Sequence, residues 1–371
     1  MIYADNAATT KLDTDAYHAM LPYLLDHYGN PSQPYSFGRE AKKALKNSRE
    51  VIAECIGAEP NEIYFTSGGT ESDNWAIKGS INCINDHDVL ASKIEHHAVL
   101  NACAAVEKYG VPVSYMLPET DGTITPEILS SHITNKTTLV SVMLANNEIG
   151  TIEPVAALAE MAHHYGALFH TDAVQAVGHI PIDVKKLDVD MLSASGHKFN
   201  APKGIGFLYI KKGTQIKPYI SGGAQEFGKR AGTENVAAIV AMAEALKKNC
   251  ADMGKTAEKL HKMEELFTQV LDKAGIDYIR NGSIDRIPGN INISIKNVGG
   301  EMLLHRLDLK GICISTGSAC DSVNTQISHV IDAICVPKAY AEGTVRISFG
   351  RDNDIEDAVH VAQAIISVLM K

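Results

Sequence analysis

The sequence contains no run of about 18 consecutive apolar residues, so no membrane-spanning helix is expected. Its first residues have neither a basic region nor an apolar core, so no secretory signal peptide is expected there. Basic residues are in deficit, with 34 Lys and Arg against 44 Asp and Glu and a formal net charge of -10. We therefore expect no interaction with nucleic acid or with an anionic membrane.

Cysteines are few and show no regular spacing. Their number, 7, is odd, and no Cys-x-x-Cys pair occurs, so neither a zinc site nor a disulfide framework is expected. The pattern favours a reducing cytoplasm and a protein without a bound metal. Neither G-x-G-x-x-G nor G-x-x-x-x-G-K-[ST] is present, so no dinucleotide or Walker-type site is indicated.

The chain is long enough, at 371 residues with 45% hydrophobic residues, for a large core and a smaller second domain. Short apolar runs alternate with helical patterns such as Val99–Tyr109 and Val155–His164. This alternation predicts an α/β domain with a mostly parallel, seven-stranded sheet. The expected strands are Glu62–Thr66, Val89–Ser92, Val113–Leu117, Leu139–Ala145, Leu168–Thr171, Asp190–Ser193 and Ile205–Ile210.

The pattern changes in the last third of the sequence. Residues 234–273 predict one long helix or two in succession, and strands at Asn290–Ile295 and Thr344–Ser348 follow. We expect a large α/β domain over residues 12–255 and a smaller α+β domain made of residues 1–11 and 256–371. The polar segment Gly317–Lys338 is expected to be irregular and to contain a mobile loop.

Three motifs carry candidate chemistry, each after an expected strand. Ser67–Ser72 is rich in glycine and opens a helix, which is typical of a phosphate cradle but also of an ordinary capped turn. Asp172 stands at a strand end, where it could protonate a pyridine nitrogen or merely cap a helix. Lys198 is a candidate Schiff-base former, although a lone lysine is more often a surface residue. Their order along the chain is more specific than any one of them.

These motifs resemble the cysteine desulfurases of the class V aminotransferase family, in the fold-type I group of enzymes that use pyridoxal 5'-phosphate (PLP). The resemblance extends over nearly the whole chain. The Ser318–Cys320 element resembles the branch of the family that supplies iron–sulfur cluster assembly. The matching segments are Tyr3–Thr10, Thr66–Ser72, Glu95–Val99, Asn146–Gly150, Asp172–Gln175, Ser195–Lys198, Arg230–Thr233, Ser318–Cys320 and Val345–Ser348.

The resemblance implies a role for each matching position around the cofactor. Lys198 would form the Schiff base, Asp172 would pair with the pyridine nitrogen, and Gln175 would contact the phenolic oxygen. His96 would stack on the ring and transfer protons. The residues that would hold the phosphate are Gly69, Thr70, Ser195 and His197.

It also implies contacts with the substrate and with a second subunit. Asn147 would lie beside cofactor and substrate, and Arg346 would bind the substrate carboxylate with its planar two-donor fork. Thr233 would reach the phosphate of the neighbouring subunit, which implies a homodimer.

Cys320 is the expected acceptor of the sulfur. PLP stabilises a carbanion at the substrate's α-carbon but supplies no group that accepts sulfur, so a second thiolate is needed. The small residues Gly317, Ser318 and Ala319 before it suit a hinge. Asp321 directly after it would raise the pKa of the thiol by like-charge repulsion.

The sequence therefore predicts an enzyme that converts L-cysteine to L-alanine and leaves a persulfide on Cys320. A sulfur-acceptor protein, such as an iron–sulfur scaffold, or a small thiol would receive the sulfur. The alternatives are a selenocysteine lyase, a class V aminotransferase, which needs no such thiol, and a sulfur-relay adaptor without catalysis. The acceptor, the pathway and any role of Cys335 stay open at this stage.

Overall fold

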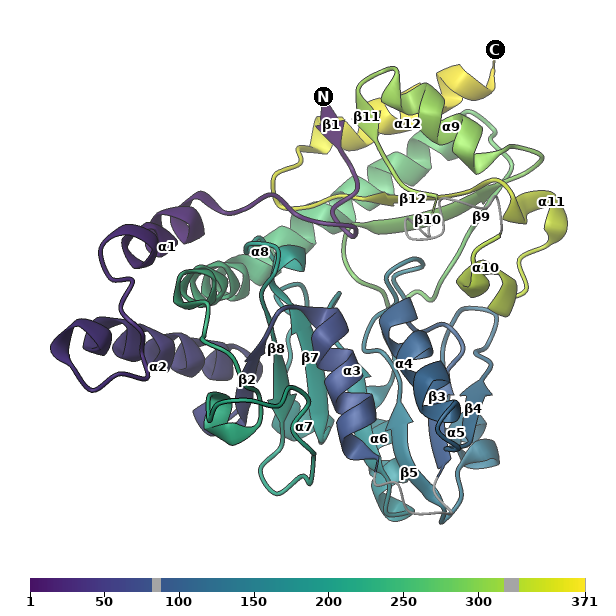
Figure 1. The fold of residues 1–371 in the computed structure, drawn as a ribbon. Helices are drawn as coiled ribbons and strands as arrows, with labels where there is room; N and C mark the ends of the chain where they lie inside the picture. The colour runs from purple at the N-terminus through teal and green to yellow at the C-terminus, as the bar shows by residue number, and fades with distance from the viewer. Residues whose placement is uncertain (82–87, 317–326, 371) are drawn as a thin grey trace.

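The computed structural model describes residues 1–81, 88–316 and 327–370. Its larger part is built on one seven-stranded sheet with the strand order β2-β8-β7-β6-β5-β3-β4 (Figure 1). β8 runs antiparallel to both neighbours and the other pairings are parallel, which confirms the predicted mostly parallel sheet. The strands are Ile63–Thr66 (β2), Asp88–Ser92 (β3), Val113–Met116 (β4), Thr137–Ser141 (β5), Leu168–Asp172 (β6), Met191–Ser195 (β7) and Gly206–Ile210 (β8).

Helices cover both faces of this sheet, and alternate strand residues point to opposite faces. Val89 and Met191 pack with Trp75 and Val99 of the helices on one face, whereas Leu90 contributes to the larger core on the other. The first face carries Gly69–Ser80 (α3) and His97–Glu107 (α4). The second carries Ser36–Ile56 (α2), Pro126–His132 (α5), Val155–His164 (α6) and Val184–Leu187 (α7), and Thr14–Leu25 (α1) packs against the long helix of residues 236–273.

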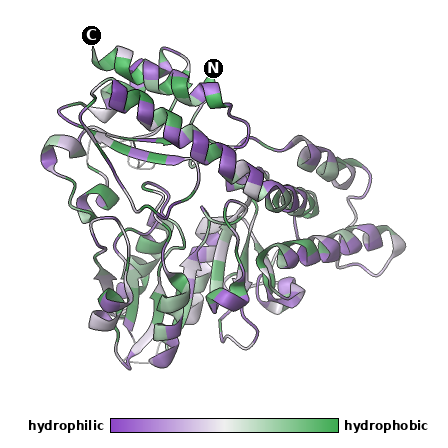
Figure 2. Ribbon diagram, turned by 180° about the vertical axis from the view of Figure 1, so that it is seen from behind, coloured by the Kyte–Doolittle hydropathy of each residue, from purple (hydrophilic) through white to green (hydrophobic). Residues whose placement is uncertain are grey.

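α2 shows how the sequence pattern specifies this packing. Its buried residues include Ala41, Leu45, Ile52 and Ile56, which recur close to the helical period of 3.6. Figure 2 shows the resulting alternation of hydrophobic and hydrophilic residues along the helix. Among the helices of the described residues, none combines the length and the hydropathy that crossing a membrane requires.

A second core lies above the carboxyl ends of the parallel strands. Its sheet has the order β12-β10-β9, and a separate parallel pair joins β1 to β11. Two helices, α9 and α12, pack on this core, which includes Ile293, Leu303 and Ile365. The elements are Ile2–Tyr3 (β1), Tyr278–Arg280 (β9), Asn290–Ile295 (β10), Gly300–Asp308 (α9), Ile312–Cys313 (β11), Thr344–Ser348 (β12) and Ile355–Leu369 (α12).

One helix belongs to both cores. Val236–Lys273 (α8) is a single helix of 38 residues, where the sequence left open one helix or two. Its first half places Ile239 and Leu246 in the core of the large sheet. Its second half places Leu260 and Phe267 in the second core. The boundary at residue 255 that we drew from the sequence lies between these two stretches and stays a proposal.

Two expectations differ from the structure. β5 ends at Ser141 rather than at residue 145, although the N–H groups of Val142 and Leu144 still donate to the backbone oxygens of His170 and Asp172 in β6. The described part of the expected irregular segment 317–338 contains a helix, His329–Ala333 (α10), and Lys338–Ala341 (α11) begins at its end. The expected mobile loop falls on residues 317–326, which lie outside the described residues. Ser328 caps α10, and Val330 and Ile331 pack with Ile94, so a short amphipathic helix forms in a segment that looked polar.

Candidate active site

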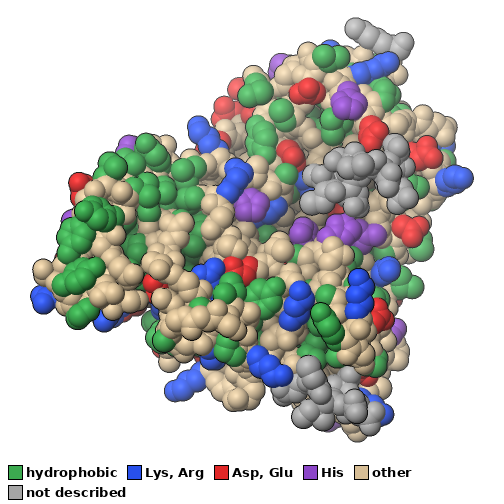
Figure 3. Space-filling model, in the orientation of Figure 1, with side chains coloured by type: hydrophobic (Ala, Val, Ile, Leu, Met, Phe, Trp, Pro, Cys, Tyr) green, Lys and Arg blue, Asp and Glu red, His purple; other side chains and the backbone are tan. Residues whose placement is uncertain are grey.

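A cavity of ≈ 260 Å³ lies between the two cores, at the carboxyl ends of the parallel strands. Ligands of open α/β sheets bind at this edge. Figure 3 shows histidine side chains gathered on this face, where the two parts of the chain meet. We call the side formed by the large sheet the floor (Gly69, Thr70, Asp73, Asp172 and Ser195). The opposite side, formed by Ala7, Ala8 and Arg346, is called the roof.

The first turn of α3 forms one end of the floor and suits an anion. Glycines are required there, because a Cβ on Gly69 would lie 2.6 Å from Val174 Cγ2. A Cβ on Gly206 would lie 2.7 Å from Gly68 Cα, so β8 and the loop pack backbone against backbone. A helix N-terminus presents free N–H groups and a positive dipole end. Four of the predicted phosphate-binding residues line the cavity, namely Gly69, Thr70, Ser195 and His197.

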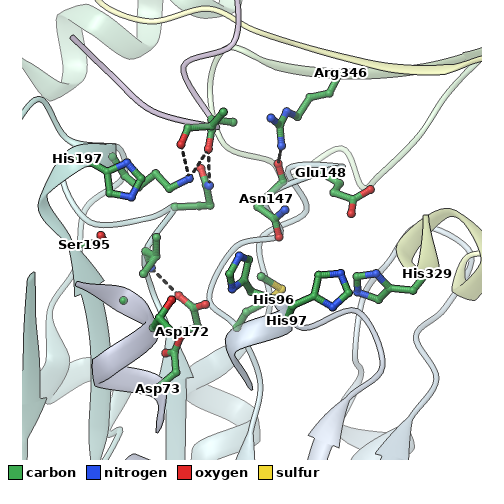
Figure 4. A pocket seen from close by; sticks show the side chains of 18 residues that line it. Asp73, His96, His97, Asn147, Glu148, Asp172, Ser195, His197, His329 and Arg346 are labelled. Carbon is green, nitrogen blue, oxygen red and sulfur yellow. Dashed lines mark hydrogen bonds between the residues drawn. The ribbon is translucent and has the colours of Figure 1, made fainter. Parts of the chain in front are cut away.

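Two carboxyl groups lie side by side in the floor (Figure 4). Asp172 is the last residue of β6, and its Oδ1 accepts a hydrogen bond of 2.9 Å from the Val174 N–H. Burial raises the pKa of Asp172 to about 6. Asp73 of α3 is 1% exposed, and burial and the nearby Asp172 raise its pKa well above the ordinary value.

Histidines form the side wall. His96 caps α4, and its Nδ1 accepts a hydrogen bond of 3.1 Å from the Ala98 N–H. Burial, followed by the charge of Lys198, lowers the pKa of His96 to about 4, so the ring is neutral near pH 7. The ring centroids of His97 and His329 lie 4.9 Å apart, and His329 comes from α10.

Lys198 reaches from the end of the floor to the roof. It lies in the 3-10 turn Gly196–Lys198 that follows β7. Its Nζ donates hydrogen bonds to the backbone oxygens of Ala7 at 2.6 Å and Ala8 at 2.9 Å. Gln175 Nε2 donates to the same Ala7 oxygen at 2.9 Å. The N-terminal segment and the large domain therefore meet at this amine.

Arg346 of β12 is the cation of the roof. It is 2% exposed. Its Nη2 donates to Asp5 Oδ1 at 2.8 Å and its Nη1 to the Asn147 backbone oxygen at 2.8 Å. Its Nε is buried and has no hydrogen-bond partner among the described residues. Each Nη nitrogen carries a second N–H, so the guanidinium retains donors for a further acceptor.

Comparison with known proteins gives a consistent result. The family model described as aminotransferase class V matches residues 2–361. The chain is similar to "Cysteine desulfurase IscS" of Dictyoglomus turgidum, with 46% identity over 374 residues, covering 100% of this chain and 95% of that protein.

Two solved structures are similar as well. One is named "NIFS-LIKE PROTEIN", with a TM-score of 0.93, 34% identity and coverage of 100% of this chain and 99% of that chain. The other is named "SspA in complex with cysteine", with a TM-score of 0.84, 32% identity and coverage of 94% and 99%.

The chain belongs to the cysteine desulfurases of the class V aminotransferase family. The resemblance, the fold class and the enzyme class that were predicted from the sequence are confirmed. The family uses PLP. The pocket of this desulfurase fits that group, since an anion-binding helix end, a buried carboxyl pair and an amine lie around one cavity.

Most of the predicted site residues line this cavity. The structure brings together Gly69, Thr70, His96, Asn147, Asp172, Gln175, Ser195, His197, Lys198 and Arg346. Thr233 does not line it and is exposed. Cys320 lies outside the described residues.

The motifs missed several groups in and next to the pocket of this desulfurase. Asp73 was overlooked although it lies one helical turn after Gly69 and Thr70, a spacing that places all three on one helix face. His97 directly follows His96, and His329 opens α10. Glu148 also lines the cavity, and its Oε2 accepts a hydrogen bond of 2.6 Å from the Ser328 hydroxyl.

Proposed function

We propose that this desulfurase binds PLP through Lys198, removes sulfur from L-cysteine and holds it as a persulfide on Cys320, releasing L-alanine. The observation that carries the cofactor assignment is the convergence of Lys198, Asp172 and the α3 N-terminus on one cavity. A PLP-binding site needs an amine, an acid for the ring nitrogen and an anion-binding end, and these three lie around that space.

The floor would hold the cofactor. Gly69, Thr70, Ser195 and His197 would bind the phosphate group, and Asp172 would keep the ring nitrogen protonated. His96 would stack on the ring, and Gln175 would contact the phenolic oxygen. When bound, PLP supplies an electron sink for bond cleavage at the substrate's carbons.

The roof would bind the substrate. Arg346, which lines the cavity, would take the carboxylate of L-cysteine with the N–H groups of its planar fork. Asn147 would lie beside both cofactor and substrate. A neutral His96, with its Nδ1 engaged by the Ala98 N–H, would use Nε2 to pass protons at the substrate.

The transfer of sulfur takes place between two thiols, that of L-cysteine and that of Cys320, and its atoms and electrons balance. The thiolate of Cys320 attacks Sγ of cysteine, an S–S bond forms, and the C–S bond of the substrate breaks. The electrons of that bond end on the substrate's carbon, which is protonated to give alanine. One cysteine and one thiol thus give one alanine and one persulfide, with no external oxidant.

The decisive experiment compares Cys320→Ser with Cys335→Ser in PLP-loaded protein supplied with L-cysteine. Cys320→Ser is expected to lower alanine release by about a thousandfold or more, because removing a nucleophile abolishes its covalent route. Intact-mass analysis of the wild type should show one added sulfur, mapped to the peptide containing Cys320. Cys335, which is exposed, is the matched control and should leave both readouts unchanged. Undiminished alanine release by Cys320→Ser would overturn the assignment.

The wider arrangement belongs to the same proposal. Two copies would form a homodimer in the cytoplasm, with Thr233 of each reaching the other's phosphate group, and a sulfur-acceptor protein would take the persulfide. The exposure of Thr233 supports this role, because an exposed hydroxyl is accessible to a second chain. Thr233→Val should weaken PLP binding without changing the elution of the dimer in size-exclusion chromatography.

A further inference from the structure

The acid that is predicted to face the ring nitrogen has a second acid beside it. One oxygen of Asp73, one oxygen of Asp172 and one ring nitrogen of His96 all lie within 4.8 Å of one another. Asp73 is 1% exposed and Asp172 is 4% exposed. Two ionised carboxylates at this distance in a buried site repel each other strongly, because little water screens them.

Burial raises the pKa of both acids, and among the described residues the charge of Lys198 offsets part of this for Asp172, whereas no cation does so for Asp73. His170 Nε2 lies 3.7 Å from Asp73 Oδ1, but burial lowers the pKa of His170 to about 3, so the ring is neutral. Its nitrogens are engaged by Ser141 at 2.8 Å and Ser193 at 3.0 Å. His96 is neutral as well, and Glu95, a third acid close by, is fully buried.

The carboxyl group of Asp73 has one oxygen that can carry a proton. Burial raises the pKa of Asp73 by more than the Ser193 hydroxyl close by lowers it. Oδ1 is buried and has no hydrogen-bond partner among the described residues. An ionised oxygen without a partner is among the costliest groups to bury, whereas a protonated oxygen offers a donor to an adjacent carboxylate.

We propose that Asp73 is neutral in the PLP-loaded enzyme and that its O–H donates to the carboxylate of Asp172. Asp73 is thus a positioning residue: it leaves the single negative charge on Asp172 and directs that carboxylate toward the ring nitrogen. The bound pyridinium then balances one carboxylate, and the proton on Asp73 balances the other. This inference rests on the proposed function, because it takes PLP as the group that Asp172 meets.

Two substitutions separate this role from simple space filling. Asp73→Asn is neutral and isosteric, and its amide can donate to Asp172 while its oxygen accepts from Ser193. Asp73→Leu fills a similar volume but donates nothing. We expect Asp73→Asn to bind PLP within about threefold of the wild type and Asp73→Leu to bind about tenfold or more weakly, since a hydrogen bond to a charged group is lost. Thermal unfolding of both variants verifies that they fold.

Two spectroscopic readouts make the test independent of turnover. In the infrared difference between loaded wild type and loaded Asp73→Asn, we expect loss of the C=O band of a protonated carboxyl group. With PLP labelled with ¹⁵N in the ring, Asp73→Asn should keep the chemical shift of a protonated ring nitrogen, and Asp73→Leu should move it toward the unprotonated value.

The results separate the protonation state of Asp73 from the binding of PLP itself. Loss of a carboxylate band instead of a carboxyl band would show that Asp73 is ionised and would overturn the inference while leaving the proposed function intact. So would an Asp73→Asn variant as impaired as Asp73→Leu. A wild type that binds no PLP would overturn the proposed function itself, before any variant is compared.

Discussion

The floor and the roof of the pocket satisfy their polar groups in different ways. In the floor, Asp172 is held by the backbone of its own strand end, and Asp73 is fixed on the helix that begins at the glycine loop. In the roof, Arg346 is held by Asp5, and the backbone oxygens of Ala7 and Ala8 hold the Lys198 amine that reaches across from the floor. The floor uses the rigid sheet, whereas the roof uses contacts between segments that are far apart in the chain.

This difference indicates which groups must exchange partners when the pocket fills. The floor groups can receive a cofactor without losing the bonds that position them. The Lys198 amine must break its hydrogen bonds to two carbonyl oxygens before it can form a covalent bond. Arg346 must divide its N–H groups between Asp5 and a substrate carboxylate. Substitutions in the roof should therefore change the binding of L-cysteine without changing the binding of PLP. Substitutions at Lys198, where floor and roof meet, should affect both.

The largest effect is expected at that junction. Lys198→Ala removes the amine that would hold the cofactor covalently, so turnover should fall by about a thousandfold or more. The visible absorbance of the bound cofactor should change as well. Lys203→Ala, an exposed lysine five residues further on, is the matched control and should retain both colour and rate. An active, normally coloured Lys198→Ala protein would remove the basis of the comparison.

A smaller effect is expected in the roof. Arg346→Lys keeps the charge but loses the planar fork that donates to Asp5, to Asn147 and to the substrate. The KM for L-cysteine should rise about tenfold or more, since at least one charge-assisted hydrogen bond is lost. PLP affinity, which belongs to the floor, should not change. Arg280→Lys on β9, paired with Glu264, serves as the control. A parallel loss of PLP affinity in Arg346→Lys would contradict the separation of floor and roof.

Asp5 tests the same pair from its other side. Asp5→Asn removes the negative charge that competes with the substrate carboxylate, while its amide oxygen can still accept from Arg346. We expect the KM for L-cysteine to fall about threefold, because one unit of competing negative charge is removed beside Arg346. A rise in KM would mean that Asp5 serves mainly to orient the guanidinium, and steady-state kinetics distinguish the two results.

The smallest effect concerns Asp13, in the segment that leads from the roof to α1. Asp13 caps α1 and pairs with Lys248 at 3.0 Å and with Arg351. Burial raises its pKa, but these partners and the cap N–H groups outweigh burial and lower it to about 2, from an ordinary value of 3.8.

A pKa that is lower in the folded state stabilises the protein above the unfolded value. This contribution should be complete above about pH 4 and should disappear as the pH falls toward 2. Asp13→Asn should therefore cost about 1 kcal/mol of unfolding free energy near neutral pH. The cost should vanish in acid, which denaturant titrations at several pH values can measure. A cost that persists unchanged in acid would assign the effect to packing.

The floor could be predicted from the sequence because its residues follow strands. Asp172 and Lys198 stand directly after buried apolar runs, and parallel strands end at a common edge. Asp73 lies one helical turn after Gly69 and Thr70, but its pairing with Asp172 could not be predicted, because it depends on how β6 lies beside α3 in the fold.

The roof contains groups that leave no signal in the sequence. The backbone oxygens of Ala7 and Ala8 accept from Lys198, and any residue type would present the same oxygens. The pairing of Asp5 with Arg346 joins residues 341 positions apart. His329 was hidden because α10 is short and follows a polar stretch, so its apolar residues form no long periodic pattern.

The 38 residues of α8 have a consequence for how the protein denatures. A straight helix of that length extends for about 57 Å, and each of its halves completes a different core. Unfolding of either half of α8 would expose the apolar residues of the core that this half completes and would weaken the helix that the other core needs. Heat should therefore disrupt both cores together. Calorimetry should accordingly record one endotherm, with the whole chain acting as a single cooperative unit.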